Sequence, residues 1–134
     1  MTMATVGDWM SRQLLVLDAS ATVGEAASLM AQRHVGSVLV THTGHLAGIF
    51  TERDLVRAVS HDVHACEESI EDWFTRDPRT VTADVSLDEA REVMLGGHFR
   101  HLPVTEGPAG PVIGMLSMRD IARATAEIES RAHA

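Results

Sequence analysis

The chain has 134 residues, of which 45% are hydrophobic and 22% charged, enough for one compact domain or two small halves that share a core. Its formal net charge of −8 disfavours a general nucleic-acid-binding protein, because neutralising phosphates requires clustered cations. A single cysteine excludes an internal disulfide framework, and no apolar run approaches the roughly 18 residues that a membrane span needs. Residues 1–7 lack a signal-peptide pattern, so we expect a soluble cytoplasmic protein with neither nucleic-acid nor membrane partners.

The first half of the chain predicts six elements. They are, in order, an opening helix, a short extended run, a longer helix, two strands and a last helix. They are expected to begin near residues 5, 14, 22, 37, 46 and 51. The longer helix is indicated by the capping-box spacing of Thr22 and Glu25, followed by apolar residues at helical spacing as far as Met30. Residues 61–68 are polar and acidic, which is typical of a linker.

The second half of the chain repeats the first. Residues 6–10 match residues 70–74 at an offset of 64, and residues 48–54 match residues 114–120 at an offset of 66. The duplication predicts an α/β (α+β) fold of two pseudo-symmetric repeats, each a small three-stranded sheet with two main helices. We place the repeats at residues 1–62 and 70–134, joined by a linker at residues 63–69 into one intertwined module.

The end of each repeat carries a short motif: a glycine that we expect to end a strand, two apolar residues, Thr or Ser, and Asp three residues later. This order of elements and motifs resembles the CBS domain, named after cystathionine β-synthase, twice over residues 6–126. In that family a tandem pair, called a Bateman module, is the usual unit. The resemblance implies a non-catalytic regulatory module that binds AMP, ADP, ATP or S-adenosylmethionine in the cleft between the two domains. It also implies an effector protein, unidentified here, a homodimer and no required cofactor.

The motif residues make chemical sense for such a ligand. A strand that leads into a helix N-terminus attracts phosphate, and an ionised carboxylate accepts hydrogen bonds from both ribose hydroxyls. The resemblance assigns phosphate to Thr51 and Ser117, and ribose to Asp54 and Asp120. A purine could lie between the apolar neighbours, which are Val38, Ile49, Leu102 and Met115. The same spacing is also that of an ordinary capping box, which needs no ligand.

Cations distinguish the two repeats. Arg100 and His101 precede the first main strand of the second repeat, where the first repeat has Gly36 and Ser37. The resemblance implies that such basic residues contact phosphates, because an arginine side chain offers a fork of donors. Alternatively, Arg100 is a solvated surface charge and His101 a packed strand residue. We predict that phosphorylated ligands depend on Arg100 more than adenosine does. Because the two motifs are expected to face each other across a pseudo-two-fold axis, Arg100 could instead reach a ligand held by Thr51 and Asp54. The first repeat also has Leu39 where the family commonly has proline.

Two other functions remain open from the sequence. One is a structural or protein-interaction module without a small ligand. The other is metal binding through His61, His64 and Cys66, although their spacing is not that of a recognised closed zinc site. No catalytic arrangement is supported by spacing, so we do not expect an enzyme. Candidate residues for a dimer face, which could equally cover their own sheets, are Val56, Val59, Ile121 and Ile128.

Overall fold

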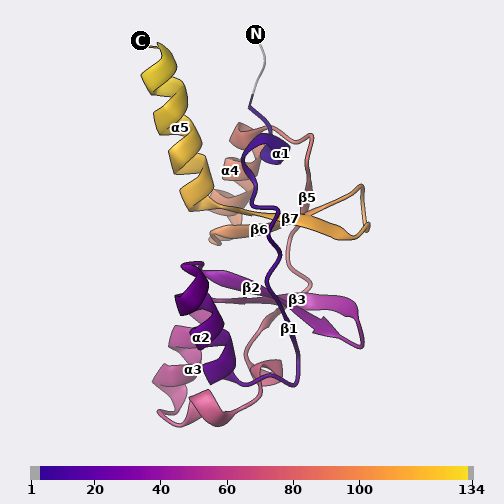
Figure 1. Ribbon diagram of the computed structural model, residues 1–134, viewed down its shortest axis with the longest axis vertical. Helices are drawn as coiled ribbons and strands as arrows, with labels where there is room; N and C mark the ends of the chain where they lie inside the picture. Colours follow the sequence, from indigo (N-terminus) through magenta and orange to yellow (C-terminus); the bar gives the residue numbers. More distant parts are fainter. Residues whose placement is uncertain (1–3, 133–134) are drawn as a thin grey trace. The chain divides into compact units, whose positions relative to one another are not determined.

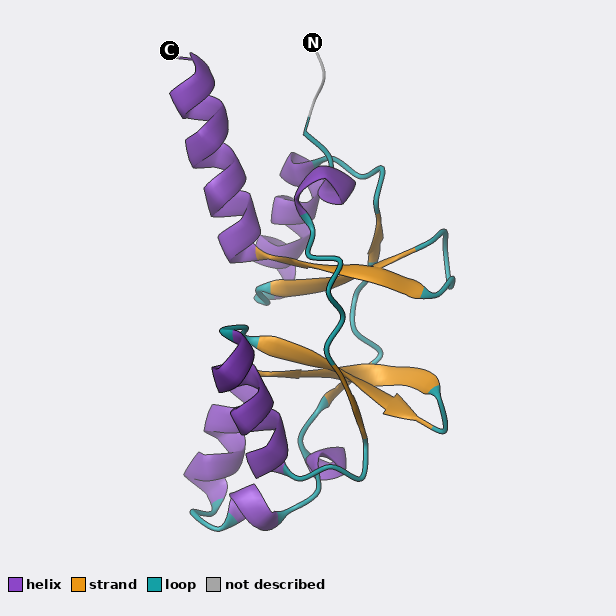
Figure 2. Ribbon diagram, in the orientation of Figure 1, coloured by secondary structure: helices purple, strands orange, loops and turns teal. Residues whose placement is uncertain are grey.

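The computed structural model describes residues 4–132, which form two compact units (Figures 1 and 2). One unit is residues 15–78. The other combines residues 4–14 with residues 79–132. The units therefore do not follow the repeat boundaries, because each contains the body of one repeat and the opening segment of the other. Within the described residues, we find no helix with the length and apolar character needed to cross a membrane.

The unit of residues 15–78 is a four-stranded sheet with helices on one face (Figure 2). In chain order its elements are β1 (Val16–Asp18), α2 (Val23–Arg33), β2 (Ser37–His42), β3 (His45–Thr51), α3 (Glu52–His61), two 3-10 turns (Ala65–Glu67 and Ile70–Asp72) and β4 (Thr75–Arg76). The strand order is β1-β2-β3-β4, with β1 parallel to β2 and the other pairs antiparallel. The core joins Val38 and Phe50 of the sheet to Met30 of α2 and Ala58 of α3.

The second unit repeats this plan with a three-stranded sheet. Its elements are α1 (Val6–Trp9), β5 (Val81–Thr82), α4 (Leu87–Gly97), β6 (His101–Thr105), β7 (Val112–Ser117) and α5 (Met118–Ala132). The strand order is β5-β6-β7, again with the first pair parallel and the second antiparallel. Leu102 and Leu116 of the sheet pack with Met94 of α4 and Ile121 of α5.

The predicted helices and strands are present, except that the opening helix of the second repeat is a single 3-10 turn (Ile70–Asp72). There are three further differences. The first sheet has a fourth strand, because Thr75 pairs with Ile49 of β3. The expected linker is partly ordered, since Ala65 begins a 3-10 turn and is fully buried in the core. The two glycines of the repeated motif lie inside β3 and β7 rather than at a strand end.

The opening segments explain those glycines. Gly48 lies against the carbonyl oxygen of Thr75, and a Cβ on Gly114 would lie 2.5 Å from the Met10 Sδ. In the second unit the segment is held by backbone hydrogen bonds, including Val6 N–H to Val85 O at 2.8 Å. The two glycines therefore admit another segment of the same chain.

Proline explains why β5 is shorter than β1. Leu39 donates its backbone N–H to the Leu15 carbonyl at 2.8 Å, and its pairing with Val16 adds a third residue pair to the parallel ladder. Pro103 occupies the matching position in β6 and has no N–H to donate. The ladder between β5 and β6 therefore contains two pairs, beginning at Val81.

Candidate functional site

The first candidate site lies where β3 leads into α3. Thr51 is the N-cap of the helix, and its backbone N–H donates to Asp54 Oδ2 at 2.9 Å. In return, the Asp54 backbone N–H donates to Thr51 Oγ1 at 3.4 Å. Both halves of a capping box are thus formed, so this hydroxyl and this carboxylate already stabilise the helix start.

The second candidate site has the same geometry where β7 leads into α5. Ser117 donates to Asp120 Oδ2 through its backbone N–H at 2.8 Å and through its hydroxyl at 2.9 Å. The Asp120 N–H donates back to Ser117 Oγ at 3.1 Å. The structure brings each predicted pair together as a capping box, and the ligand role assigned to these residues remains a prediction.

The two carboxylates differ in their exposure and in the number of hydrogen bonds that they already accept. The Asp54 side chain is 2% exposed and also accepts hydrogen bonds from Arg57 at 3.2 Å and from the Thr75 hydroxyl at 3.3 Å. The Asp120 side chain is 15% exposed and accepts a further bond from Arg123 at 3.1 Å. Asp120 is therefore the more accessible acceptor for an incoming hydroxyl.

Sequence reasoning missed three of these partners. Arg57 and Arg123 each follow their carboxylate by three residues, a spacing that places them on the same helix face and could have identified them. Thr75 is 21 residues from Asp54 and reaches it because β4 pairs with β3. No local pattern signals that contact.

The backbone amides at the helix starts are less free than we expected for a phosphate site. The N–H of Glu52 donates to the Gly36 carbonyl at 3.1 Å, and the N–H of Met118 donates to the Arg100 carbonyl at 2.9 Å. In each capping box the amides of the hydroxyl residue and the aspartate are bonded as well. A phosphate at either site would therefore depend on side-chain cations more than on the helix amides.

The predicted cations gather at the second site. His101 pairs with Ser117 across the antiparallel ladder of β6 and β7 and is half-buried. Arg100 is exposed, and its carbonyl is bonded to the first residue of α5. The structure thus places Arg100, His101, Ser117 and Asp120 around one strand–helix junction.

The predicted apolar residues divide into two pairs. Val38 and Leu102 are 1% and 0% exposed and belong to the cores of their own units. Ile49 and Met115 lie outside those two core clusters, and by the alternation of strand side chains they point to the opposite sheet face. Val38 and Leu102 therefore pack on the core side of the strands, on the face opposite to Ile49 and Met115.

An open hollow of about 560 Å³ lies elsewhere, beside α2. It is lined by Leu17, Gly24, Glu25, Ser28, Leu29 and Gln32. None of the predicted site residues borders it.

The alternative metal site is not assembled. Within residues 4–132, no group of three or more His, Cys, Asp or Glu side chains is arranged to hold a metal ion. The His61 ring lies 5.6 Å from the Trp73 ring, between centroids, and Cys66 is an exposed free thiol. His61, His64 and Cys66 therefore do not form the three-ligand cluster that this alternative requires.

The candidate dimer residues also divide. Ile121 is 5% exposed and packs in the core of its own unit, so it does not contribute to a surface. Val56 and Val59 of α3 are 67% and 40% exposed, and Ile128 of α5 is 47% exposed. These three side chains are available to a partner.

Both repeats match a known protein family. The family model of the CBS domain matches residues 6–61 and residues 70–127. The chain belongs to the CBS domain family. Each match covers one repeat, and the mixed α/β fold expected of a CBS pair is confirmed.

CBS relatives occur among proteins of similar size. The chain is 34% identical over 119 residues to an uncharacterized 17.7 kDa protein of Acidianus ambivalens, covering 88% of this chain and 71% of that protein. The crystal structure of the CBS-domain containing protein ATU1752 from Agrobacterium tumefaciens has a TM-score of 0.86 at 34% identity, covering 93% and 96% of the two chains. CBSX2 of Arabidopsis thaliana, solved in complex with AMP, has a TM-score of 0.78 at 27% identity, covering 94% and 98%.

Proposed function

We propose that this CBS pair is a non-catalytic sensor that binds an adenosine-containing ligand through its duplicated strand–helix junctions. The observation that carries the proposal is the pairing of a hydroxyl with a carboxylate at each junction, through Thr51 and Asp54 and through Ser117 and Asp120. A similar CBS pair, CBSX2, has been solved with AMP. An unidentified effector protein would respond to the binding of the ligand.

The second junction is the better candidate for a phosphorylated ligand such as AMP, ADP or ATP. It combines the more exposed carboxylate, Asp120, with Arg100 beside the start of α5. In a protein of net charge −8, a phosphate needs a local cation to offset long-range repulsion. Arg100 supplies that charge, and Asp120 accepts the ribose hydroxyls.

Calorimetric titration of adenosine and AMP into the full chain tests this assignment. Asp120→Ala should weaken both ligands, because both carry the ribose. Arg100→Ala should weaken AMP about 10- to 100-fold and leave adenosine nearly unchanged, since a hydrogen bond to a charged group contributes about 1.5–3 kcal/mol. Arg91→Ala, which removes an exposed arginine of α4, is the charge-matched control and should leave both affinities unchanged.

The proposal fails if neither adenosine nor AMP, ADP, ATP or S-adenosylmethionine binds. A thermal-shift series with these five compounds gives a first answer, because a ligand at 100 times its Kd stabilises the folded state by about 2.7 kcal/mol. If Arg100→Ala weakens adenosine as much as AMP, then Arg100 does not contact phosphate.

We also propose that the module forms a homodimer through its exposed helical side chains. Val56 is the most exposed of the three candidates, at 67%. Val56→Lys places a charge in any apolar interface formed there and should shift a dimer to monomer in light scattering. A wild-type monomer at micromolar concentration would contradict this proposal, as would a Val56→Lys protein that remains dimeric.

A further inference from the structure

The two junctions carry opposite charge at two matching positions. In the second repeat one backbone hydrogen bond joins Met118 to Arg100, at 2.9 Å. In the first repeat the equivalent bond joins Glu52 to Gly36, at 3.1 Å. Because both bonds link the first helical residue to the residue that precedes a strand, the side chains are directly comparable. Together, Arg100 and Met118 of the second repeat carry a charge of +1, whereas Gly36 and Glu52 of the first repeat carry −1.

The other charges at the junctions are equivalent. Each aspartate forms an ion pair with an arginine three residues later, at 3.2 Å for Asp54 with Arg57 and at 3.1 Å for Asp120 with Arg123. The position between the hydroxyl and the aspartate is also an arginine in both repeats. With histidine counted as neutral, so that His101 and Ser37 do not differ, the difference in formal charge between the junctions therefore comes from the residues joined by that backbone hydrogen bond.

Backbone amides do little to compensate for this difference. At both junctions the N–H groups of the hydroxyl residue, the first helical residue and the aspartate already have partners inside the protein. Glu52 is also exposed in the first turn of α3, where its carboxylate interacts favourably with the helix dipole. An anionic ligand at this junction would therefore be repelled by the Glu52 carboxylate, which the helix already stabilises.

We propose, building on the proposed function, that the two junctions select adenosine ligands by charge. The second junction takes a phosphorylated nucleoside. The first takes an adenosine derivative without phosphate, whose 5′ group is uncharged or cationic, and Glu52 is the residue that rejects phosphate. Since a ribose would displace the Thr75 hydroxyl from Asp54, the first junction binds its ligand more weakly than the second binds its own.

The test compares AMP with uncharged 5′-methylthioadenosine by calorimetry on the full chain. In the wild type, AMP should bind one site per chain and should bind Asp120→Ala only weakly, whereas 5′-methylthioadenosine should still bind Asp120→Ala. Adding Glu52→Gln to Asp120→Ala should strengthen AMP on the order of tenfold, the effect of removing one like charge near a surface site, and leave 5′-methylthioadenosine unchanged. The reciprocal change, Met118→Glu in the wild type, should weaken AMP by a similar factor.

Two variants separate local charge from other effects. Glu25→Gln removes a carboxylate from the first turn of α2, so it matches the change in net charge made by Glu52→Gln and should leave AMP binding unchanged. Met118 is half-buried against its core, so Met118→Gln reports the cost of changing that packing without adding charge.

The inference is overturned if AMP fills both sites of the wild type equally, or if Glu52→Gln leaves AMP binding to Asp120→Ala unchanged while 5′-methylthioadenosine binds. If neither compound binds the wild type, both this inference and the proposed function fail, which is a different result from binding without charge selection.

Discussion

The exchange of opening segments predicts that Val6→Ala destabilises the body of the second repeat, although Val6 precedes the first. Val6 is fully buried and packs in one cluster with Leu87, Ala90 and Met94. Removing two buried carbon groups costs about 0.8 kcal/mol each, and the remaining cavity adds to this, for a loss of about 2 kcal/mol. That loss corresponds to a roughly 30-fold larger opening constant for the unit.

Native-state hydrogen exchange measures this effect for each unit separately. In Val6→Ala the amides of α4 (residues 87–97) should exchange about 30-fold faster, whereas those of α2 (residues 23–33) should be unchanged. Ile70→Val is the reciprocal control, because Ile70 is buried in the other core and should loosen α2 instead. If Val6→Ala exposes α2 and spares α4, then the opening helix stabilises its own repeat and the reasoning is refuted.

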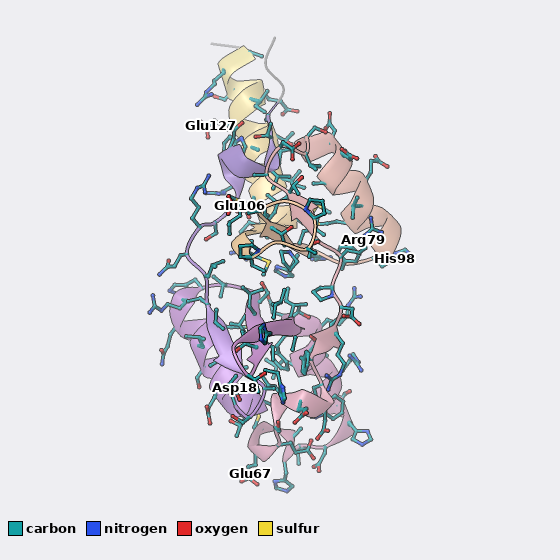
Figure 3. All side chains as sticks on the ribbon, turned by 90° about the vertical axis from the view of Figure 1, so that its right-hand side faces the viewer. Asp18, Glu67, Arg79, His98, Glu106 and Glu127 are labelled. Carbon is teal, nitrogen blue, oxygen red and sulfur yellow. The ribbon has the colours of Figure 1, made fainter. Side chains whose placement is uncertain are left out.

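Three further predictions follow from other contacts. Asp54→Ala should lower the free energy of unfolding in urea by about 3 kcal/mol and Asp120→Ala by about half as much, because Asp54 is more buried and has an additional donor; equal losses would contradict this. Gly48→Ala should lower thermal stability by about 1–3 kcal/mol, because its Cβ would collide with a neighbouring backbone carbonyl; an unchanged melting temperature would show that the segment can move away. The hydroxyl and backbone amide of Ser20 lower the pKa of the Asp18 carboxyl, which lies at the end of β1 (Figure 3). Since the folded pKa is depressed, this stabilisation is present above the unfolded pKa and is lost as pH falls through the folded one. NMR titration of Ser20→Ala should show a higher Asp18 pKa, and an unchanged midpoint would exclude this cause.

Local signals were sufficient to predict most elements of the fold. The Thr22 and Ser86 side chains accept the N–H of the residue three positions on, at 3.0 and 3.1 Å, and α2 and α4 begin at the next residues. The fourth strand could not be predicted, because two residues, Thr75 and Arg76, carry too little pattern. Their pairing with β3 depends on a tertiary contact, and so does the exchange of opening segments.

The candidate junctions were predictable only where their contacts are local in the sequence. A hydroxyl three residues before a carboxylate is a local motif, so Ser117 and Asp120 were expected to meet. The hydrogen bonds that these amides already make could not be predicted, because the bond from Met118 to Arg100 joins the start of α5 to the residue that precedes β6, which is distant in the sequence. Pro103 could be read for its missing N–H, but the sequence did not show that this would shorten β5 by one residue pair.

The unit of residues 15–78 is continuous in the sequence, whereas the second unit combines the chain segments that precede and follow it. On the ribosome the continuous unit can therefore complete its sheet first, while α1 waits for α4 and α5 to be synthesised. About 110 residues separate Leu14 from Ala124 of the last core helix, so at ordinary translation rates the wait is on the order of 5 to 20 s. During synthesis the apolar side chains of this segment, which include Val6 and Trp9, therefore have no core to pack against until α4 and α5 emerge.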